Sequence, residues 1–243
     1  MFESFFHGLC ALLYPSCCVL CKIRLKTTDK TQWLCAACQE TIELNRPPFC
    51  RICSRHIADV ASSTVLCHEC RKTTYHFDCA WAATIYNKSM KQLIHFFKYR
   101  QKTYLRSYFS RLMTAFLHVY QIDLACFEAA VPIPLHPSRA RERGYNQSQL
   151  LLEGLLSTVK IPILKNSLIR IKNTPNQALL GKKDRWTNIR GAFRIKSHLS
   201  VNNKSILIVD DLLTTGATTS EAARLLKDAG AKKVGVFTLA IGS

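Results

Sequence analysis

The chain lacks the two glycine-rich signatures that most often mark nucleotide sites. It contains no Gly-Lys-Ser or Gly-Lys-Thr, which argues against a triphosphate-binding P-loop. It also contains no Gly-x-Gly-x-x-Gly, which argues against a dinucleotide site. If this protein binds a phosphorylated ligand, another kind of loop must do so.

An apolar run long enough to cross a bilayer, which takes about 20 residues, is also missing. Residues 5–14 are apolar but too few, and the stretch 201–242 is interrupted by four acidic residues. The N-terminus has neither a basic region nor an Ala-x-Ala-like cleavage site. We therefore expect residues 5–14 to form a short amphipathic helix, and the protein to be cytoplasmic with no membrane insertion.

Acidic residues are scarce. The chain of 243 residues has 16 Asp and Glu against 34 Lys and Arg, a formal net charge of +18. Residues 1–80 are nearly balanced, with 9 basic and 7 acidic residues, so the excess belongs to the remainder. Such a surface suits a polyanionic partner through counterion release. Apolar residues make up 48%, so we expect a folded chain.

Cysteine, in contrast, is abundant and regularly spaced. Eleven of the 12 cysteines lie in the first third of the chain, and eight form four Cys-x-x-Cys knuckles. Thirteen residues separate the first knuckle from the second and the third from the fourth, so one unit repeats after 32 positions. The eight residues are Cys18, Cys21, Cys35, Cys38, Cys50, Cys53, Cys67 and Cys70.

Two knuckles supply the four thiolates of a closed, structural zinc site. Free thiols or a redox dithiol would explain one knuckle, but four at duplicated spacing favour zinc. The repeat favours sequential pairing, although an interleaved cross-brace would use the same residues. Cys10, Cys17, Cys79 and Cys126 have no partner in this scheme, and His56, His68 and His76 are near enough to substitute as ligands.

From residue 80 the pattern becomes that of an α/β sheet flanked by helices. We expect strands over 82–86, 129–133 and 206–209, and helices over 90–97, 104–119, 147–156 and 220–229, the last closed by Gly230. The sequence therefore predicts two domains: residues 1–79, an N-terminal helix with a double zinc ribbon, and residues 80–243, a mainly parallel sheet with helices.

Two carboxylates follow the buried strand 206–209, at the edge of the sheet where open α/β proteins bind ligands. Asp210 and Asp211 are followed by residues 214–218, a small, hydroxyl-rich loop with one glycine that opens the next helix. Such a loop can offer backbone N–H groups and hydroxyls to a single phosphate. Each feature alone suits a solvated turn or a helix cap, but their order is specific.

This order resembles the signature of type I phosphoribosyltransferases, which bind phosphoribosyl pyrophosphate. The resemblance implies that Asp210 and Asp211 are the catalytic pair, holding the ribose hydroxyls directly or through Mg²⁺ as positive charge develops on the ribose. It also implies a substrate-binding loop around the 5′-phosphate, formed by Leu213, Thr214, Thr215, Gly216, Ala217 and Thr218.

The chain as a whole resembles the ComF/GntX family of competence-related proteins, which join a double zinc ribbon to a type I phosphoribosyltransferase-like domain. The match lies in the knuckles and in residues 93–100, 131–137, 139–147, 173–177 and 188–193. By this resemblance Arg139, Arg141 and Arg143 form a pyrophosphate-contacting loop after a strand; a solvated basic loop is the alternative. Residues 173–193 have little periodicity, which suggests a mobile lid.

Two functions remain open. The resemblance implies a protein of DNA uptake and natural transformation, with a phosphoribosyl pyrophosphate site and a basic surface for single-stranded DNA, and with DNA-uptake helicase or recombination-mediator proteins as partners. Tyr99, Tyr104, Tyr108 and Tyr145 could stack on bases, although ordinary packing roles are the alternative. The other function is an active (amido)phosphoribosyltransferase of nucleotide metabolism or salvage, which transfers the phosphoribosyl group to ammonia, an amine or a base and has no DNA role. No residue stands out as a general base for an acceptor, so binding is better supported than turnover.

Overall fold

Four parallel strands form the central sheet, in the order β1, β6, β5, β2. The structure, a computed structural model, describes residues 17–25, 33–57, 66–156, 158–174, 181–196 and 201–242. The strands are β1 (Cys79–Ile85), β2 (Ala129–Pro132), β3 (Leu168–Arg170), β4 (Phe193–Ile195), β5 (Ser205–Leu213) and β6 (Lys233–Ile241). The helices are α2 (Ala36–Glu40), α3 (His68–Lys72), α4 (Lys88–Tyr99), α5 (Leu105–Val119), α6 (Pro137–Arg143), α7 (Gln147–Leu155), α8 (Lys182–Ile189) and α9 (Ala217–Asp228).

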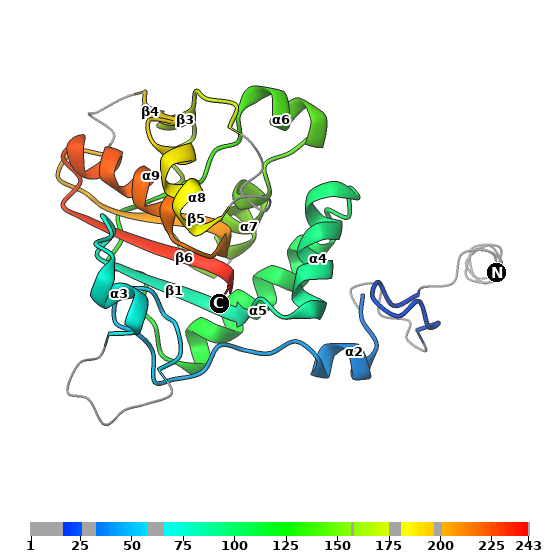
Figure 1. Cartoon of the computed structure of the whole chain (residues 1–243). Coiled ribbons are helices and arrows are strands. Elements are labelled where there is room, and N and C mark those ends of the chain that lie inside the picture. The colour runs from blue at the N-terminus through cyan, green and yellow to red at the C-terminus, as the bar shows by residue number, and fades with distance from the viewer. Residues whose placement is uncertain are drawn as a thin grey trace.

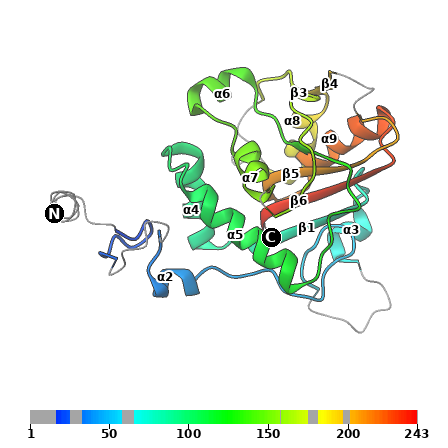
Figure 2. The ribbon, with the colours of Figure 1, turned by 180° about the vertical axis from the view of Figure 1, so that it is seen from behind.

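Helices cover both faces of the sheet, which explains the unbroken apolar run of β5. Leu207 and Val209 pack in one core with α4, α5 and α7. Ile206 and Ile208 point to the opposite face, into a second core with α9. Figure 1 shows α8 and α9 on one side of the sheet, and Figure 2 shows the reverse side with α5 and α7. The predicted α/β class with a parallel sheet is confirmed.

The expected elements are found with shifted ends. The helix expected to start at residue 220 begins at Ala217, and Gly230, at φ 93°, follows its end as predicted. The strand expected to stop at residue 209 continues to Leu213. β6 and the antiparallel pair β3 and β4 are additions to the expected elements. The helix expected over 5–14 lies outside the described residues.

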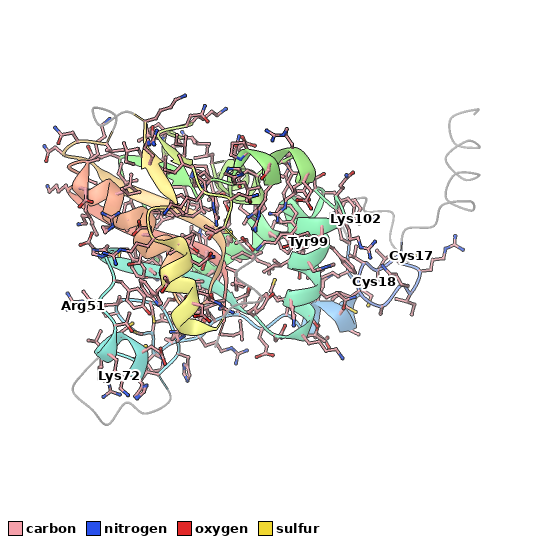
Figure 3. All side chains as sticks on the ribbon, turned by 45° about the horizontal axis from the view of Figure 1, so that its top comes forward. Cys17, Cys18, Arg51, Lys72, Tyr99 and Lys102 are labelled. Atoms are coloured by element: carbon pink, nitrogen blue, oxygen red, sulfur yellow. The ribbon has the colours of Figure 1, made fainter. Side chains whose placement is uncertain are left out.

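The two cysteine-rich units pack against different cores. Cys18 and its neighbours join the core of α4 and α5, where the Trp33 and Tyr104 rings lie 4.1 Å apart. Cys50, Cys53 and Cys70 join the core of α9 on the other face. Figure 3 labels Cys18 and Arg51 at opposite ends of the molecule, which places the two units far apart. The predicted domain boundary after residue 79 falls within β1, and the division into two domains stays a prediction.

Candidate functional site

Asp210 and Asp211 lie inside β5, not after it as the sequence suggested. β5 stays paired with β6 as far as Leu213. Both carboxylates therefore belong to the last residues of the strand, just before the loop. Asp210 Oδ1 accepts hydrogen bonds from Ser148 Oγ at 2.8 Å and from the Asp211 N–H at 2.9 Å. Ser148 belongs to α7, so the beginning of that helix positions the first carboxylate.

The second carboxylate has a cationic partner that sequence reasoning missed. Lys98 Nζ of α4 lies 2.5 Å from Asp211 Oδ2, and Gln147 Nε2 of α7 donates to Asp211 Oδ1 at 3.4 Å. The Asp211 side chain is 4% exposed and the Lys98 side chain 20%, so the carboxylate of this ion pair is buried and the ammonium group is partly buried. Lys98 and Gln147 both lie in segments that carry the family resemblance. That resemblance was the one feature of the sequence that could have pointed to them.

The environment of Asp210 changes its pKa. Burial, followed by repulsion from Asp211, raises the pKa of Asp210 to about 7, although Lys98 and Ser148 oppose the shift. Burial alone would lower the pKa of Lys98, but the Asp211 carboxylate outweighs it and the pKa is raised. Lys98 therefore stays charged beside Asp211, and Asp210 titrates near neutrality.

The loop after β5 turns sharply into α9. Gly216 caps α9 with φ 76°, a left-handed conformation that favours glycine. Thr215 Oγ1 accepts from the Ala217 N–H at 3.4 Å, and Ser220 N–H donates to the Gly216 carbonyl at 2.8 Å. α9 is 12 residues long. The N–H groups of its first turn and the positive end of its dipole favour an anion at this end.

A cavity of about 910 Å³ joins these features. Asp210, Asp211, Thr214 and Thr218 all line it, so the structure brings the acidic pair and both ends of the loop to one space. Other predicted loop residues do not line it. Leu213 and Ala217 are 2% and 1% exposed, so their side chains anchor the loop in the protein.

Two of the three predicted arginines face the cavity. Residues 137–143 form helix α6 and not the expected loop, so Arg139 and Arg143 share one face, four positions apart. Both line the cavity. Arg143 also lies over the Tyr99 ring, 5.0 Å from its centroid, and donates to Gln147. Arg141 is exposed and outside the lining, because a helix turns it to another face.

Arg170, at the end of β3, is a further basic residue of the cavity. Arg170 Nη2 donates to the Thr174 hydroxyl at 2.5 Å, and Arg139 Nη2 donates to the Thr174 carbonyl oxygen at 2.6 Å. Burial, and then the charge of Arg139, lowers the pKa of Arg170 to about 10. Two guanidinium groups so close together can attract a multiply charged anion. No motif in the sequence pointed to Arg170.

Much of the described part of the segment expected to be a mobile lid, residues 173–193, has regular structure. Residues 182–189 form α8, which packs on α9, and β4 pairs with β3. Arg185 of α8 lines the cavity. Trp186 lies beside Tyr75, with ring centroids 5.8 Å apart. Residues 175–180, including part of the family-like stretch, lie outside the described residues.

The cysteines gather in two sets of four, in the sequential order that the repeat favoured. One set is Cys18, Cys21, Cys35 and Cys38, and the other is Cys50, Cys53, Cys67 and Cys70. Within each set the Sγ atoms lie within 4.8 Å of one another, with close pairs at 3.6 and 3.5 Å. Four sulfurs about 2.3 Å from one zinc would lie roughly 3.8 Å apart, so both sets fit a tetrahedral ion.

The remaining cysteines and histidines lie outside these sets in the part of the chain that the structure describes. Cys17, Cys79 and Cys126 are members of neither cluster, and Cys10 is not described. His56 Nδ1 lies 3.0 Å from the Arg46 carbonyl oxygen, and His68 is 68% exposed next to Glu69. The structure therefore supports four-cysteine sites without a histidine ligand.

The chain is similar to known proteins over most of its length. Residues 161–242 match the phosphoribosyl transferase domain family. Competence protein F of Haemophilus influenzae is 30% identical over 228 residues, covering 92% of this chain and 96% of that protein. The chain belongs to the ComF/GntX family. A second member, the DNA utilization protein YhgH of Escherichia coli K12, is 30% identical over 222 residues, covering 85% of this chain and 96% of that protein.

A solved structure with similarity to this ComF/GntX chain is a purine phosphoribosyltransferase from Pyrococcus horikoshii. It is 17% identical, with a TM-score of 0.32, and the match covers 55% of this chain and 70% of that chain. Among the described residues of the ComF/GntX chain, no helix combines the length and apolar character needed to cross a bilayer.

Proposed function

We propose that the cavity binds phosphoribosyl pyrophosphate, in a ComF-like protein that handles DNA during uptake. One observation carries the proposal: the buried acidic pair, the loop at the start of α9 and the arginines of α6 and β3 line the same cavity. A ligand with one phosphate, one diol and one pyrophosphate has groups complementary to all three.

Each part of the site has its own task in this proposal. The first turn of α9 and the hydroxyls of Thr214 and Thr218 hold the 5′-phosphate. Asp210 and Asp211 orient the ribose hydroxyls and stabilise positive charge on the ribose, and the ion pair with Lys98 positions Asp211. Arg139, Arg143 and Arg170 attract the pyrophosphate. Bound with the ligand, Mg²⁺ would neutralise charge on that pyrophosphate, and the carboxylates at this edge are suitable oxygen donors.

The assignment of the pyrophosphate end is tested at Arg170. Arg170→Met should weaken binding of phosphoribosyl pyrophosphate by about 10- to 100-fold, since a hydrogen bond to a charged group contributes about 1.5–3 kcal/mol. Binding of ribose 5-phosphate, which lacks the pyrophosphate, should change little. Isothermal titration calorimetry with both ligands measures the difference.

Arg194→Met is the matched control, because Arg194 is exposed on β4 in the same two-stranded sheet. The control should bind both ligands like the wild type. Equal weakening of both ligands by Arg170→Met would contradict the assignment. The alternative, an active (amido)phosphoribosyltransferase of nucleotide metabolism or salvage, has its own test. The wild type is incubated with phosphoribosyl pyrophosphate, Mg²⁺ and candidate amines or bases, and released pyrophosphate is detected.

The proposed DNA contact rests on charge, with little support from aromatic stacking. Of the four tyrosines considered, Tyr104 packs on Trp33, Tyr108 is buried and Tyr145 donates to the Phe97 carbonyl. Tyr99 is 48% exposed at the end of α4, near Lys102, as Figure 3 shows. The recruitment of a DNA-uptake helicase or a recombination mediator stays a prediction, as does the cytoplasmic location.

Single-stranded DNA should bind with strong salt dependence. If about five phosphates are neutralised, the slope of log affinity against log salt is roughly −3.5. Fluorescence anisotropy with a labelled 20-mer at several salt concentrations measures this slope. A neutral-backbone oligonucleotide of the same sequence serves as the control and should not bind. A slope near zero would refute the electrostatic account.

A further inference from the structure

The second cysteine set and the phosphate loop are joined by Arg55. Arg55 lies two residues after Cys53, and its carbonyl accepts from the Cys50 N–H at 2.7 Å, so the knuckle sets its position. Its guanidinium Nη2 donates to the carbonyl oxygens of Thr214 and Gly242, the latter at 3.2 Å. Gly242 N–H in turn donates to the Leu213 carbonyl at 2.8 Å. Arg55 therefore holds the start of the loop from the cysteine side.

This knuckle is also fixed to the sheet. Ser54, at φ 65°, accepts a hydrogen bond from the Ala82 N–H of β1 at its hydroxyl, at 3.3 Å. Asn45 Nδ2 donates to the carbonyls of Ser54 and Ala82 at 2.7 and 3.1 Å. Both Asn45 and Ser54 are fully buried. The Cys50–Cys53 turn, Arg55 and β1 are thus joined by hydrogen bonds into one unit.

The other knuckle of the same set reaches the other end of the loop. Tyr75 and His76 follow α3, which holds Cys70. The Tyr75 ring packs so closely on Gly216 that a Cβ there would lie 2.5 Å from its Cε1 atom. The His76 N–H donates to Ser220 Oγ in the first turn of α9, at 3.1 Å. A metal held by this set would tie together the two segments that contact opposite ends of the loop.

We infer that metal binding at Cys50, Cys53, Cys67 and Cys70 and phosphate binding at the loop of residues 214–218 are energetically coupled, with Arg55 as the positioning residue. The inference rests on the proposed function of that loop. Coupling is reciprocal, so a ligand that favours the ordered loop also strengthens metal binding at the second set. The first set packs against α4 instead, through contacts such as Lys22 over the Phe96 ring, and should respond much less.

The test uses the full chain loaded with zinc and ribose 5-phosphate as the probe. Zinc retained against a competing chelator is measured at equilibrium, with and without the probe. One of the two zinc equivalents should be held at least about fivefold more tightly when the probe is present, at the low end of common coupling strengths. Because this comparison needs only the wild type, it decides the proposal even if a variant does not fold.

Arg55 is then replaced in the zinc-loaded protein. Arg55→Met should bind two zinc ions, lose the protection by the probe, and bind the probe about tenfold more weakly; Arg55→Lys should restore part of both effects. Arg51→Met is the matched control, since Arg51 lies in the same knuckle but is exposed, as Figure 3 shows, and should behave like the wild type.

The outcomes separate the two proposals. A wild type that binds ribose 5-phosphate but holds both zinc ions unchanged would overturn the coupling and leave the phosphate site standing. Unchanged probe binding and unchanged protection in Arg55→Met would overturn the role of Arg55. A wild type that does not bind the probe at all would overturn the phosphate site and the coupling with it.

Discussion

Replacing Asp210 and Asp211 together by asparagine is expected to abolish Mg²⁺-dependent binding of phosphoribosyl pyrophosphate, with a loss of at least about 100-fold in affinity. The amides keep the size of the side chains but remove both charges that hold the diol and the cation. Zinc content should be unchanged, because the cysteine sets lie elsewhere. Calorimetry with ligand and Mg²⁺ measures the loss, and metal analysis measures the zinc.

Asp228→Asn, which removes an exposed carboxylate of α9, is the control and should bind normally. Normal binding by the double variant would exclude the acidic pair as the ribose site. The double variant also leaves Lys98 buried without its carboxylate partner, which costs stability. Its fold therefore needs to be checked by circular dichroism, and the single variant Asp210→Asn provides a milder case.

That single variant also tests the electrostatics of the site. The pKa of Asp210 is raised from 3.8 to about 7, chiefly by burial, so between these values the folded chain binds more protons than the unfolded chain. The free energy of unfolding contributed by this group therefore falls as the pH rises from about 4 to 7. Asp210→Asn cannot ionise at this position, so the wild type should lose stability relative to this variant as the pH rises, which urea unfolding at pH 6 and pH 8 measures. A stability difference that does not change with pH would refute the raised pKa.

A side chain at Gly216 is expected to have the second large effect. Gly216→Val adds a β-branched residue at φ 76° and forces a Cβ within 2.5 Å of the Tyr75 ring. Backbone strain of this kind costs about 1–3 kcal/mol. The Tyr75 ring is stacked on Phe77, so it has little room to move away from the new side chain. We expect a melting temperature several degrees lower and no detectable binding of ribose 5-phosphate.

Gly191→Val separates backbone strain from the blocked loop. Gly191 also has a positive φ, of 63°, but its nearest neighbour is the flexible end of Lys172 at 3.3 Å. This control should lose stability and still bind the probe. If Gly216→Val binds ribose 5-phosphate as tightly as this control does, the loop is not the phosphate site. Thermal scans and calorimetry on both variants make the comparison.

Several features of this chain follow from local spacing alone. The duplicated knuckles predicted two sets of four cysteines, because a short turn brings both members of a Cys-x-x-Cys pair to one side. The apolar run of β5 predicted a strand covered on both faces, and the acidic pair followed by residues 214–218 predicted a ligand site at its end. The predicted ends of these elements were less accurate than the elements themselves. Pairing with β6 extends β5 past Asp210, and Gly216 starts α9 early.

The partners of the site residues were decided by the tertiary structure. Ser148 reaches Asp210 across 62 positions of sequence, and Arg55 reaches Thr214 across 159. Lys98 meets Asp211 only because the fold brings the end of α4 to the end of β5, and Arg170 meets Arg139 only because both reach Thr174. Local periodicity specifies which face of an element is apolar, but it carries no information about which distant polar side chain that face will meet. The sequence therefore determined the elements and the type of chemistry, whereas packing of the two cores decided which charges are paired, buried or left to meet a ligand.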